Sequence, residues 1–225
     1  FTYCTTEDDN DNNIDDGGAA DADTDSDTDS DTDTDGDTDT DTDTDTDTDA
    51  DPVCTLAALE KFEVDPTPIG WTIADNGSGG GAWKHVAPAT VVGKPWNITS
   101  DGAMLVDANA ADVMPGDTQN EDLVSPMYVM EDCAKATVTY DYNYQTDEFQ
   151  DTEVGYVYLV PEGGEPVMMH KLDRDTPVGV QFDSGTFDVL PSQLGESKSF
   201  QLKFHYEGVY GFGWYLDNVA VTGTF

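Results

Sequence analysis

The sequence predicts an all-β protein: an antiparallel β-sandwich of jelly-roll type, preceded by an extended N-terminal low-complexity segment. Apolar and polar residues alternate with a period of two in several segments between residues 136 and 221, the pattern of strands with one buried face. Gly, Pro, Asn and Asp separate these segments, and outside residues 55–62 no stretch shows helical periodicity over three turns. Many short strands divided by such turns indicate a sandwich or jelly roll.

Charge divides the 225-residue chain near Asp51-Pro52. Residues 1–51 contain 22 Asp or Glu and no Lys or Arg, whereas the other 26 acids and all eight bases lie in residues 52–225. The two parts therefore carry −22 and, from 26 acids and eight bases, −18. Only the second part has enough large apolar residues to close a core. We predict an acidic Asp/Thr stalk over residues 1–51 and one jelly-roll domain over residues 52–225.

The net charge of −40 also limits the partners. Nucleic acid and anionic membrane surfaces would be repelled, whereas divalent cations would be attracted. No apolar run approaches 18 residues, so we expect no membrane insertion. The chain begins at Phe1 without Met, which is typical of a processed secreted chain. We therefore expect an extracellular or cell-surface protein.

The stalk is a strict repeat. From Asp21 to Asp51 every odd position is Asp, and nearly all even positions are Thr or Ser. In an extended chain all carboxylates then lie on one side and all hydroxyls on the other. Repulsion between the carboxylates stretches this segment to roughly 100 Å at about 3.3 Å per residue. The simplest interpretation is a disordered acidic linker, whereas an ordered stalk would need calcium, covalent glycans or neighbouring subunits.

Dense hydroxyls favour O-glycosylation, and two Asn sequons in the domain add candidate N-linked sites. The predicted glycosylation sites are Thr24, Ser26, Thr28, Ser30, Thr32, Thr34, Thr38, Thr40, Thr42, Thr44, Thr46, Thr48, Asn76 and Asn97.

Three cysteines suggest an oxidising compartment. A Cys54–Cys133 disulfide would join the start of the domain to its middle, while Cys4 would pair with another subunit, stay free or replace one of the other two. Phe1, Tyr3 and Cys4 form a short apolar segment that could add as a donor strand to a neighbouring subunit.

Within the domain, residues 55–62 fit either a short helix or the beginning of a strand. Strands are then predicted over residues 136–144, 154–160 and 214–221. Residues 167–172 follow a Pro-Glu-Gly-Gly turn and could return as a hairpin partner. A further strand over residues 199–206 should place on one face Phe200, Leu202, Phe204 and Tyr206.

A family resemblance rests on motifs spread over residues 56–225. The motifs are Leu59-x-x-Phe62-Glu63, Pro68-Ile69-Gly70-Trp71, Trp83, Met104-Leu105-Val106-Asp107, residues 121–126 and Gly213-Trp214-Tyr215-Leu216-Asp217-Asn218-Val219. In this order they resemble the MAM-like jelly rolls of bacterial surface proteins, the cleaved-adhesin and "choice-of-anchor" domains. The resemblance implies a fold and a surface location. It also implies a structural Ca²⁺ between the first and last strands, with Glu63, Asp217 and Asp107 as ligands.

No catalytic motif is present: the three His residues are scattered, and no zinc-ligand spacing or nucleophile elbow occurs. We therefore expect no enzyme. Among the four Trp residues, Trp71 and Trp214 lie in strand motifs and should be core. Trp83 and Trp96 lie in Gly- and Pro-rich segments and are predicted to stack on sugar at the surface.

The main functional prediction is a structural subunit of a glycosylated extracellular filament or surface sheath that polymerises with itself by strand addition. The alternative is a monomeric adhesin or carbohydrate-binding module, with glycans as partners, on a flexible acidic spacer. A third interpretation, adaptation to brine, does not explain the strict Asp-Thr repeat.

Overall fold

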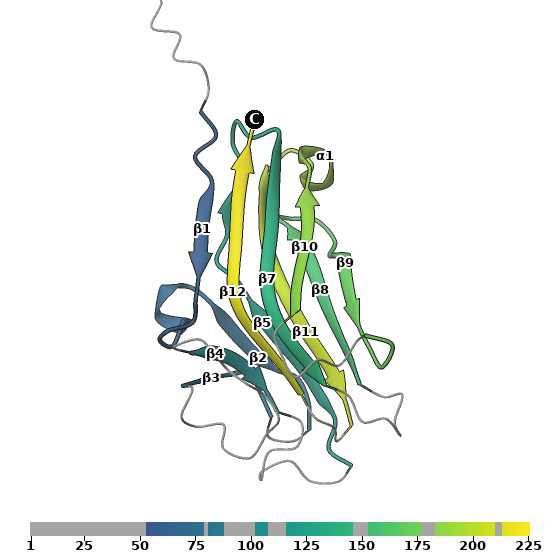
Figure 1. Ribbon diagram of the computed structural model, residues 1–225. Coiled ribbons are helices and arrows are strands. Elements are labelled where there is room, and N and C mark those ends of the chain that lie inside the picture. Colours follow the sequence, from purple (N-terminus) through teal and green to yellow (C-terminus); the bar gives the residue numbers. More distant parts are fainter. Residues whose placement is uncertain are drawn as a thin grey trace, which may run out of the picture. The chain divides into compact units, whose positions relative to one another are not determined.

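Two antiparallel β-sheets pack face to face as a sandwich in the computed structural model (Figure 1). The structure describes residues 53–78, 81–87, 102–107, 116–145, 153–176, 183–209 and 213–225. Within these ranges no helix is long and apolar enough to cross a membrane. The elements are β1 (Ala57–Glu60), the 3₁₀ turn η1 (Thr67–Ile69), β2 (Thr72–Asp75), β3 (Lys84–Val86), β4 (Ala103–Val106), β5 (Gln119–Val124), β6 (Tyr128–Val129), β7 (Lys135–Gln145), β8 (Val154–Pro161), β9 (Val167–Leu172), β10 (Asp183–Val189), α1 (Pro191–Leu194), β11 (Ser199–Gly208) and β12 (Gly213–Thr224).

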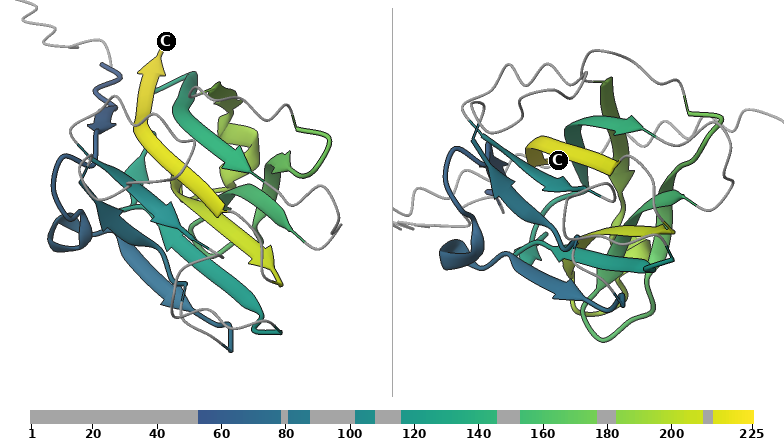
Figure 2. Two further views of the ribbon diagram at one scale, coloured as in Figure 1. Left: turned by 60° about the horizontal axis from the view of Figure 1, so that its bottom comes forward. Right: turned by 90° about the horizontal axis from the view of Figure 1, so that it is seen from below.

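The first sheet has the order β10-β7-β12-β4-β3, and β1 also pairs with β12. The second has the order β2-β5-β11-β8-β9, and β6 also pairs with β11. Figure 2 shows the two layers from two further directions. Every strand pair among the described residues is antiparallel, and several neighbours, such as β5 and β11 or β7 and β12, come from distant parts of the chain. The predicted jelly-roll sandwich is confirmed.

The core forms where the period-two pattern turns apolar side chains inward. In β11 the side chains of Phe200, Leu202, Phe204 and Tyr206 are fully buried, as predicted. Trp71 and Trp214, both predicted as core, are also buried between the sheets. Phe204 contacts Trp214 edge to face, with 5.9 Å between ring centroids, so the two sheets meet through aromatic rings.

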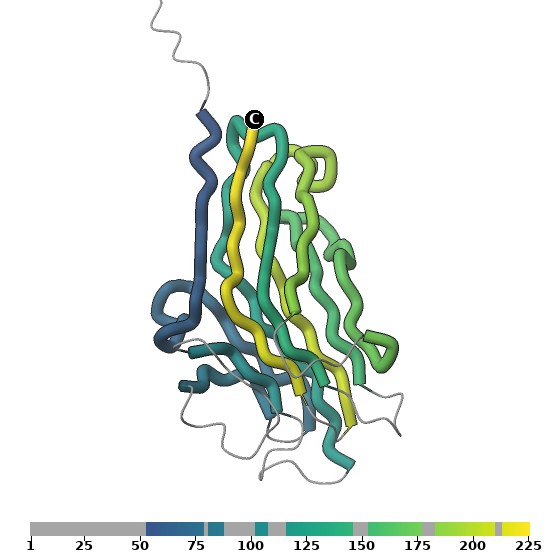
Figure 3. The backbone as a smooth tube through the Cα atoms, viewed as in Figure 1, coloured from purple at the N-terminus to yellow at the C-terminus, as the bar shows by residue number. Residues whose placement is uncertain are grey.

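Residues 55–62, which fit a helix or a strand, contain strand β1. Its residues pair with β12 from Ala57 opposite Thr222 to Glu60 opposite Val219. Figure 3 shows β1 running alongside β12. A helix of four residues would be unstable by itself because helix nucleation is costly. Pairing with the edge of β12 instead gives these residues backbone hydrogen bonds as a strand.

The predicted Cys54–Cys133 disulfide is present. Cys54 precedes β1 and Cys133 precedes β7, the two strands on either side of the last part of β12. The bond therefore spans β12, and Gly223 of β12 lies against both sulfur atoms. Cys4 lies outside the described residues.

Replacing Gly223 with alanine is expected to lower the free energy of unfolding by about 1–2 kcal/mol. A Cβ atom at this position would collide with the Sγ atoms of Cys54 and Cys133, and the disulfide cannot move without shifting β1 or β7. Chemical denaturation followed by tryptophan fluorescence measures the change. The matched control is Gly163→Ala in the β8–β9 turn, where a Cβ meets no atom within 4 Å but the positive φ of 70° still adds strain. A Gly223→Ala variant as stable as the wild type would contradict the prediction.

Candidate functional site

The solvent-facing side of the second sheet carries an unusual set of aromatic and charged side chains. Because successive residues alternate in direction, the residues of β11 between its buried aromatic positions point outward. The same alternation exposes Tyr156 and Tyr158 on β8 and Asp122 on β5. We name this surface the Tyr–His face and define it by Asp122, Tyr156, Tyr158, Lys203, His205 and Glu207.

Strand register brings these residues together from three strands. His205 stands opposite Asp122 of β5 on one side and Tyr156 of β8 on the other. Tyr156 in turn stands opposite Lys171 of β9, so one row crosses four strands. In the neighbouring row Lys203 stands opposite Tyr158.

The rings of the Tyr–His face lie side by side. The ring centroids of Tyr156 and Tyr158 are 5.7 Å apart, and those of Tyr156 and His205 are 6.0 Å apart in a stacked arrangement. The Nζ atom of Lys203 lies 5.1 Å from the Tyr158 ring centroid. Both tyrosines remain partly exposed. The partly exposed Tyr156 and Tyr158 rings thus form a small aromatic platform next to the largely buried His205 ring, bordered by charged groups.

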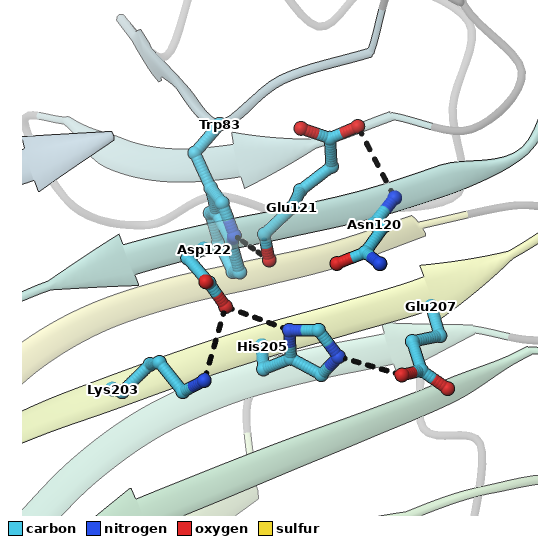
Figure 4. Close-up of polar contacts among 7 residues, drawn as sticks. All are labelled: Trp83, Asn120, Glu121, Asp122, Lys203, His205 and Glu207. Carbon is cyan, nitrogen blue, oxygen red and sulfur yellow. Dashed lines mark hydrogen bonds and ion pairs between the residues drawn. The ribbon is translucent and has the colours of Figure 1, made fainter. Parts of the chain in front are cut away.

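His205 is the centre of the polar network, which Figure 4 shows. Its Nδ1 atom lies 2.6 Å from Asp122 Oδ1, and its Nε2 atom lies 2.9 Å from Glu207 Oε1. The Lys203 ammonium is 3.6 Å from the same Asp122 oxygen. Burial acts to lower the pKa of His205, but the hydrogen bonds and charges of Asp122 and Glu207 together raise it above its ordinary value.

The same contacts affect Asp122. Burial acts to raise the pKa of its carboxyl group, but the hydrogen bond to His205 and the charge of Lys203 lower it below its ordinary value. Two acids and two bases thus neutralise one another on the Tyr–His face, although the domain as a whole is strongly acidic.

A second carboxyl group, Glu121, lies on the opposite side of the same strand. Its side chain points into the sandwich and is 0% exposed. Burial raises its pKa to about 7, and the nearby charge of Asp75 adds to this effect. Its Oε1 atom accepts a long hydrogen bond from the Asn120 backbone, and its buried Oε2 atom has no partner among the described residues.

A small pocket of 190 Å³ lies at one end of the row. It is lined by Glu153, Val154, Lys171, Asp173, Arg174 and Asp175. Since Lys171 belongs both to this pocket and to the row, the pocket extends the polar surface beyond Tyr156. Its lining mixes three acids with two bases, which suits the hydroxyl groups of a polar ligand better than an apolar one.

The hydrogen bonds of His205 resemble part of a catalytic arrangement but differ from it at one ring nitrogen. Asp122 and His205 have the geometry of an acid that orients a general base. The other ring nitrogen of His205, however, meets the Glu207 carboxylate, where a nucleophilic catalyst would need a hydroxyl or thiol. The described contacts of this His therefore activate no nucleophile.

The structure corrects the prediction for Trp83. Its side chain is 2% exposed and packs against Trp214 with 5.3 Å between ring centroids, so it is not available for sugar at the surface. Its Nε1 atom donates to the Glu121 carbonyl oxygen at 3.3 Å. The Gly-rich residues before it suggested a loop, but Trp83 immediately precedes β3 and fills the space between the sheets. Trp96 lies outside the described residues.

The predicted calcium ligands are not gathered into one site. The described residues contain no group of three His, Cys, Asp or Glu side chains that could hold a metal ion. The register explains this, because Asp107 follows the residue opposite Trp214 and therefore lies roughly 13 Å along the strand from Asp217. Glu63 is exposed, and the Asp217 carboxylate accepts a hydrogen bond from the Asn218 backbone at 2.7 Å. Calcium binding, structural in the domain or loose in the stalk, stays a prediction.

Of the predicted glycosylation sites, the described residues include only Asn76, which is exposed in the turn after β2. Asn97, all the predicted Thr and Ser sites, and the assembly residues Phe1, Tyr3 and Cys4 lie outside them. The filament prediction depends on those residues and stays a prediction.

Sequence analysis missed the Tyr–His face entirely. The alternation in β8 and β11 was visible, and it implied that Tyr156, Tyr158, Lys203 and His205 point away from the core. It did not show that β5, β11 and β8 are neighbours in one sheet. His205 and Asp122 are 83 residues apart in sequence, so only the fold brings them together.

Comparisons with known proteins support the fold. No protein-family model and no curated protein sequence matches this chain. The K1 cleaved adhesin domain of Lys-gingipain from Porphyromonas gingivalis W83 is similar in structure, with a TM-score of 0.52 and 18% sequence identity over 76% of this chain and 99% of that one. The K3 cleaved adhesin domain of the same protein gives a TM-score of 0.46 and 16% identity over 76% and 99%.

A carbohydrate-binding module, TmCBM61, solved in complex with β-1,4-galactotriose, gives a TM-score of 0.47 and 10% identity over 68% of this chain and 88% of that one. At these identities the likeness to the K1 domain concerns the fold alone. The chain thus has a β-sandwich fold similar to that of the K1 domain, while membership of the cleaved-adhesin, MAM-like or "choice-of-anchor" family stays a prediction.

Proposed function

We propose that this protein is an extracellular adhesin or carbohydrate-binding module that binds neutral glycans on its Tyr–His face. The observation that carries the proposal is the platform of Tyr156, Tyr158 and His205 rings on a solvent-facing sheet surface, bordered by Asp122, Lys203 and Glu207. Aromatic rings stack on the apolar faces of sugar rings, while charged side chains hydrogen-bond to sugar hydroxyls. This corresponds to the alternative interpretation of the sequence, with different residues at the site.

Two further observations agree with this function. The Cys54–Cys133 disulfide favours an oxidising compartment, which fits an extracellular or surface location. The net charge of −40 disfavours sulfated or uronic acid polymers, because they would be repelled at long range. The ligand class that remains is neutral polysaccharide. The sandwich shared with the K1 cleaved adhesin domain is compatible with such a role.

Replacing Tyr156 or Tyr158 with alanine is expected to weaken glycan binding about tenfold or more, since stacking on an aromatic ring contributes about 1–3 kcal/mol by analogy with bases. The full chain would be tested by affinity electrophoresis and calorimetry against soluble galactan, mannan, xylan and β-glucan, with heparin as the acidic comparison. Tyr158→Phe should retain most of the affinity because it keeps the ring.

The matched control is Thr186→Ala, an exposed residue of β10 in the other sheet. It should bind as the wild type does. If the wild type binds none of the neutral polysaccharides, or if both Tyr→Ala variants bind as well as the control, glycan binding at this face is refuted.

A further inference from the structure

The hydrogen bonds of His205 define its protonation state. A neutral imidazole has one N–H donor and one acceptor nitrogen, whereas an ionised carboxylate only accepts. Both ring nitrogens of His205 lie within hydrogen-bond distance of carboxylate oxygens, at 2.6 Å from Asp122 and 2.9 Å from Glu207. Two N–H donors are needed to satisfy both contacts, so the observed arrangement is that of an imidazolium.

The groups around His205 are named from every strand that packs against it. On its own strand, Lys203 and Glu207 point to the same side of the sheet. From β5 comes Asp122, which also contacts Lys203 at 3.6 Å. From β8 come Tyr156 and Tyr158, with ring centroids 6.0 and 6.2 Å from that of His205. Lys171 of β9 lies beyond Tyr156 in the row.

We propose that His205 is a proton-controlled clamp that orders the Tyr–His face, so that glycan binding there is switched off as the pH rises. This inference rests on the proposed function. The charged ring bridges β5 and the end of β11 and presents a fixed surface against Tyr156 and Tyr158. A ligand that stacks on these rings therefore meets a preorganised site only while His205 is protonated.

Loss of the proton to solvent breaks one of the two contacts. The remaining N–H stays with Asp122, whose side chain is 19% exposed and forms the shorter bond. The lone pair on Nε2 then faces the Glu207 carboxylate and repels it. The Glu207 side chain is 52% exposed, so it can turn into solvent. The His205 ring consequently loses its hydrogen bond to Glu207. Its position beside Tyr156 and Tyr158 is then held by the Asp122 contact alone.

The pH range over which both contacts of His205 persist follows from the shifted pKa values of His205 and Asp122. The imidazolium form persists above the ordinary pKa of histidine, because the pKa of His205 is raised despite its burial. At the alkaline end the clamp is therefore lost as the pH rises through this raised pKa. It is also lost as the pH falls through the lowered pKa of Asp122, whose carboxylate must stay ionised. Between these limits the clamp is closed.

The first experiment needs no ligand. Imidazole ¹⁵N resonances of the full-length chain would be followed by NMR from about pH 5 to about pH 9. His170 is an internal contrast, because burial lowers its pKa. His205, assigned with the His205→Gln variant, should show two protonated nitrogens well after His170 has become neutral. A His205 ring that is neutral at about pH 6 would overturn the clamp.

The second experiment measures affinity for the bound neutral polysaccharide at about pH 6 and about pH 9. The wild type should bind about tenfold more weakly at the higher pH. In Glu207→Gln the amide can pair with either form of the ring, so the pH dependence should largely disappear. Glu165→Gln, an exposed substitution in the β8–β9 turn outside the Tyr–His face, should keep the wild-type pH dependence.

The outcomes separate this inference from the proposed function. Binding of equal strength at both pH values, or equal pH dependence in Glu207→Gln and Glu165→Gln, would overturn the switch and leave glycan binding intact. Absence of binding at every pH would overturn both.

Discussion

Replacing Glu121 with glutamine is expected to stabilise the protein at alkaline pH by up to about 3 kcal/mol, from 1.36 kcal/mol per pKa unit. In the folded protein the pKa of this buried carboxyl group is raised from 4.5 to about 7, so the folded state holds a proton that the unfolded state releases. Stability contributed by the protonated form is complete below pH 4.5 and declines until the pH passes about 7. Glutamine keeps the shape without the charge.

Urea denaturation at a series of pH values tests this prediction. The wild type should lose stability between the two pKa values, whereas Glu121→Gln should lose much less over the same range. Asp75→Asn is the matched control, because it removes the neighbouring charge that raises the pKa of Glu121 but leaves the buried carboxyl group in place. A wild-type profile that is parallel to that of Glu121→Gln would show that Glu121 is ionised without cost in the folded protein.

Removing the Cys54–Cys133 disulfide is expected to lower the free energy of unfolding by about 4 kcal/mol, from the loop-closure entropy of a 79-residue separation. The disulfide lowers the conformational entropy of the unfolded chain. Its loss also frees β1, a four-residue strand that pairs on one edge only. The double variant Cys54→Ala and Cys133→Ala would be compared with the wild type by denaturation in urea.

The comparison is best made in a Cys4→Ser background, which prevents exchange with the third cysteine. Cys4→Ser alone should retain the disulfide and provides the reference. Reduction of that reference protein should reproduce the loss seen in the double variant. Equal unfolding midpoints for the oxidised and reduced proteins would contradict the prediction.

Much of the fold could be predicted because strands with one buried face carry a local pattern. The segment from Ser199 to Tyr206 shows this most clearly, since its alternate aromatic and aliphatic residues all lie in the core. The disulfide was also predictable, as Cys54 and Cys133 each precede a strand. The strand pattern depends on residues that are close together in sequence. The disulfide depends on a choice among the few pairs that three cysteines allow.

The candidate site could not be predicted, because it depends on which strands are neighbours. Alternation indicates that Tyr156 and His205 point outward, but the pairing of β8 with β11 places them together. The prediction for Trp83 was wrong for a related reason. The Gly-rich residues before it indicated a surface loop, whereas its burial results from contacts with Trp214 and Glu121 on other strands.

The bond across β12 also determines how the domain resists tension. A pull on the chain before Val53 reaches Cys54 first, and from there it passes covalently to Cys133 at the start of β7. The four residues of β1 are thereby bypassed, although alone they would unzip one hydrogen bond after another. The force acts instead on β7, an eleven-residue strand that pairs with β10 on one edge and with β12 on the other.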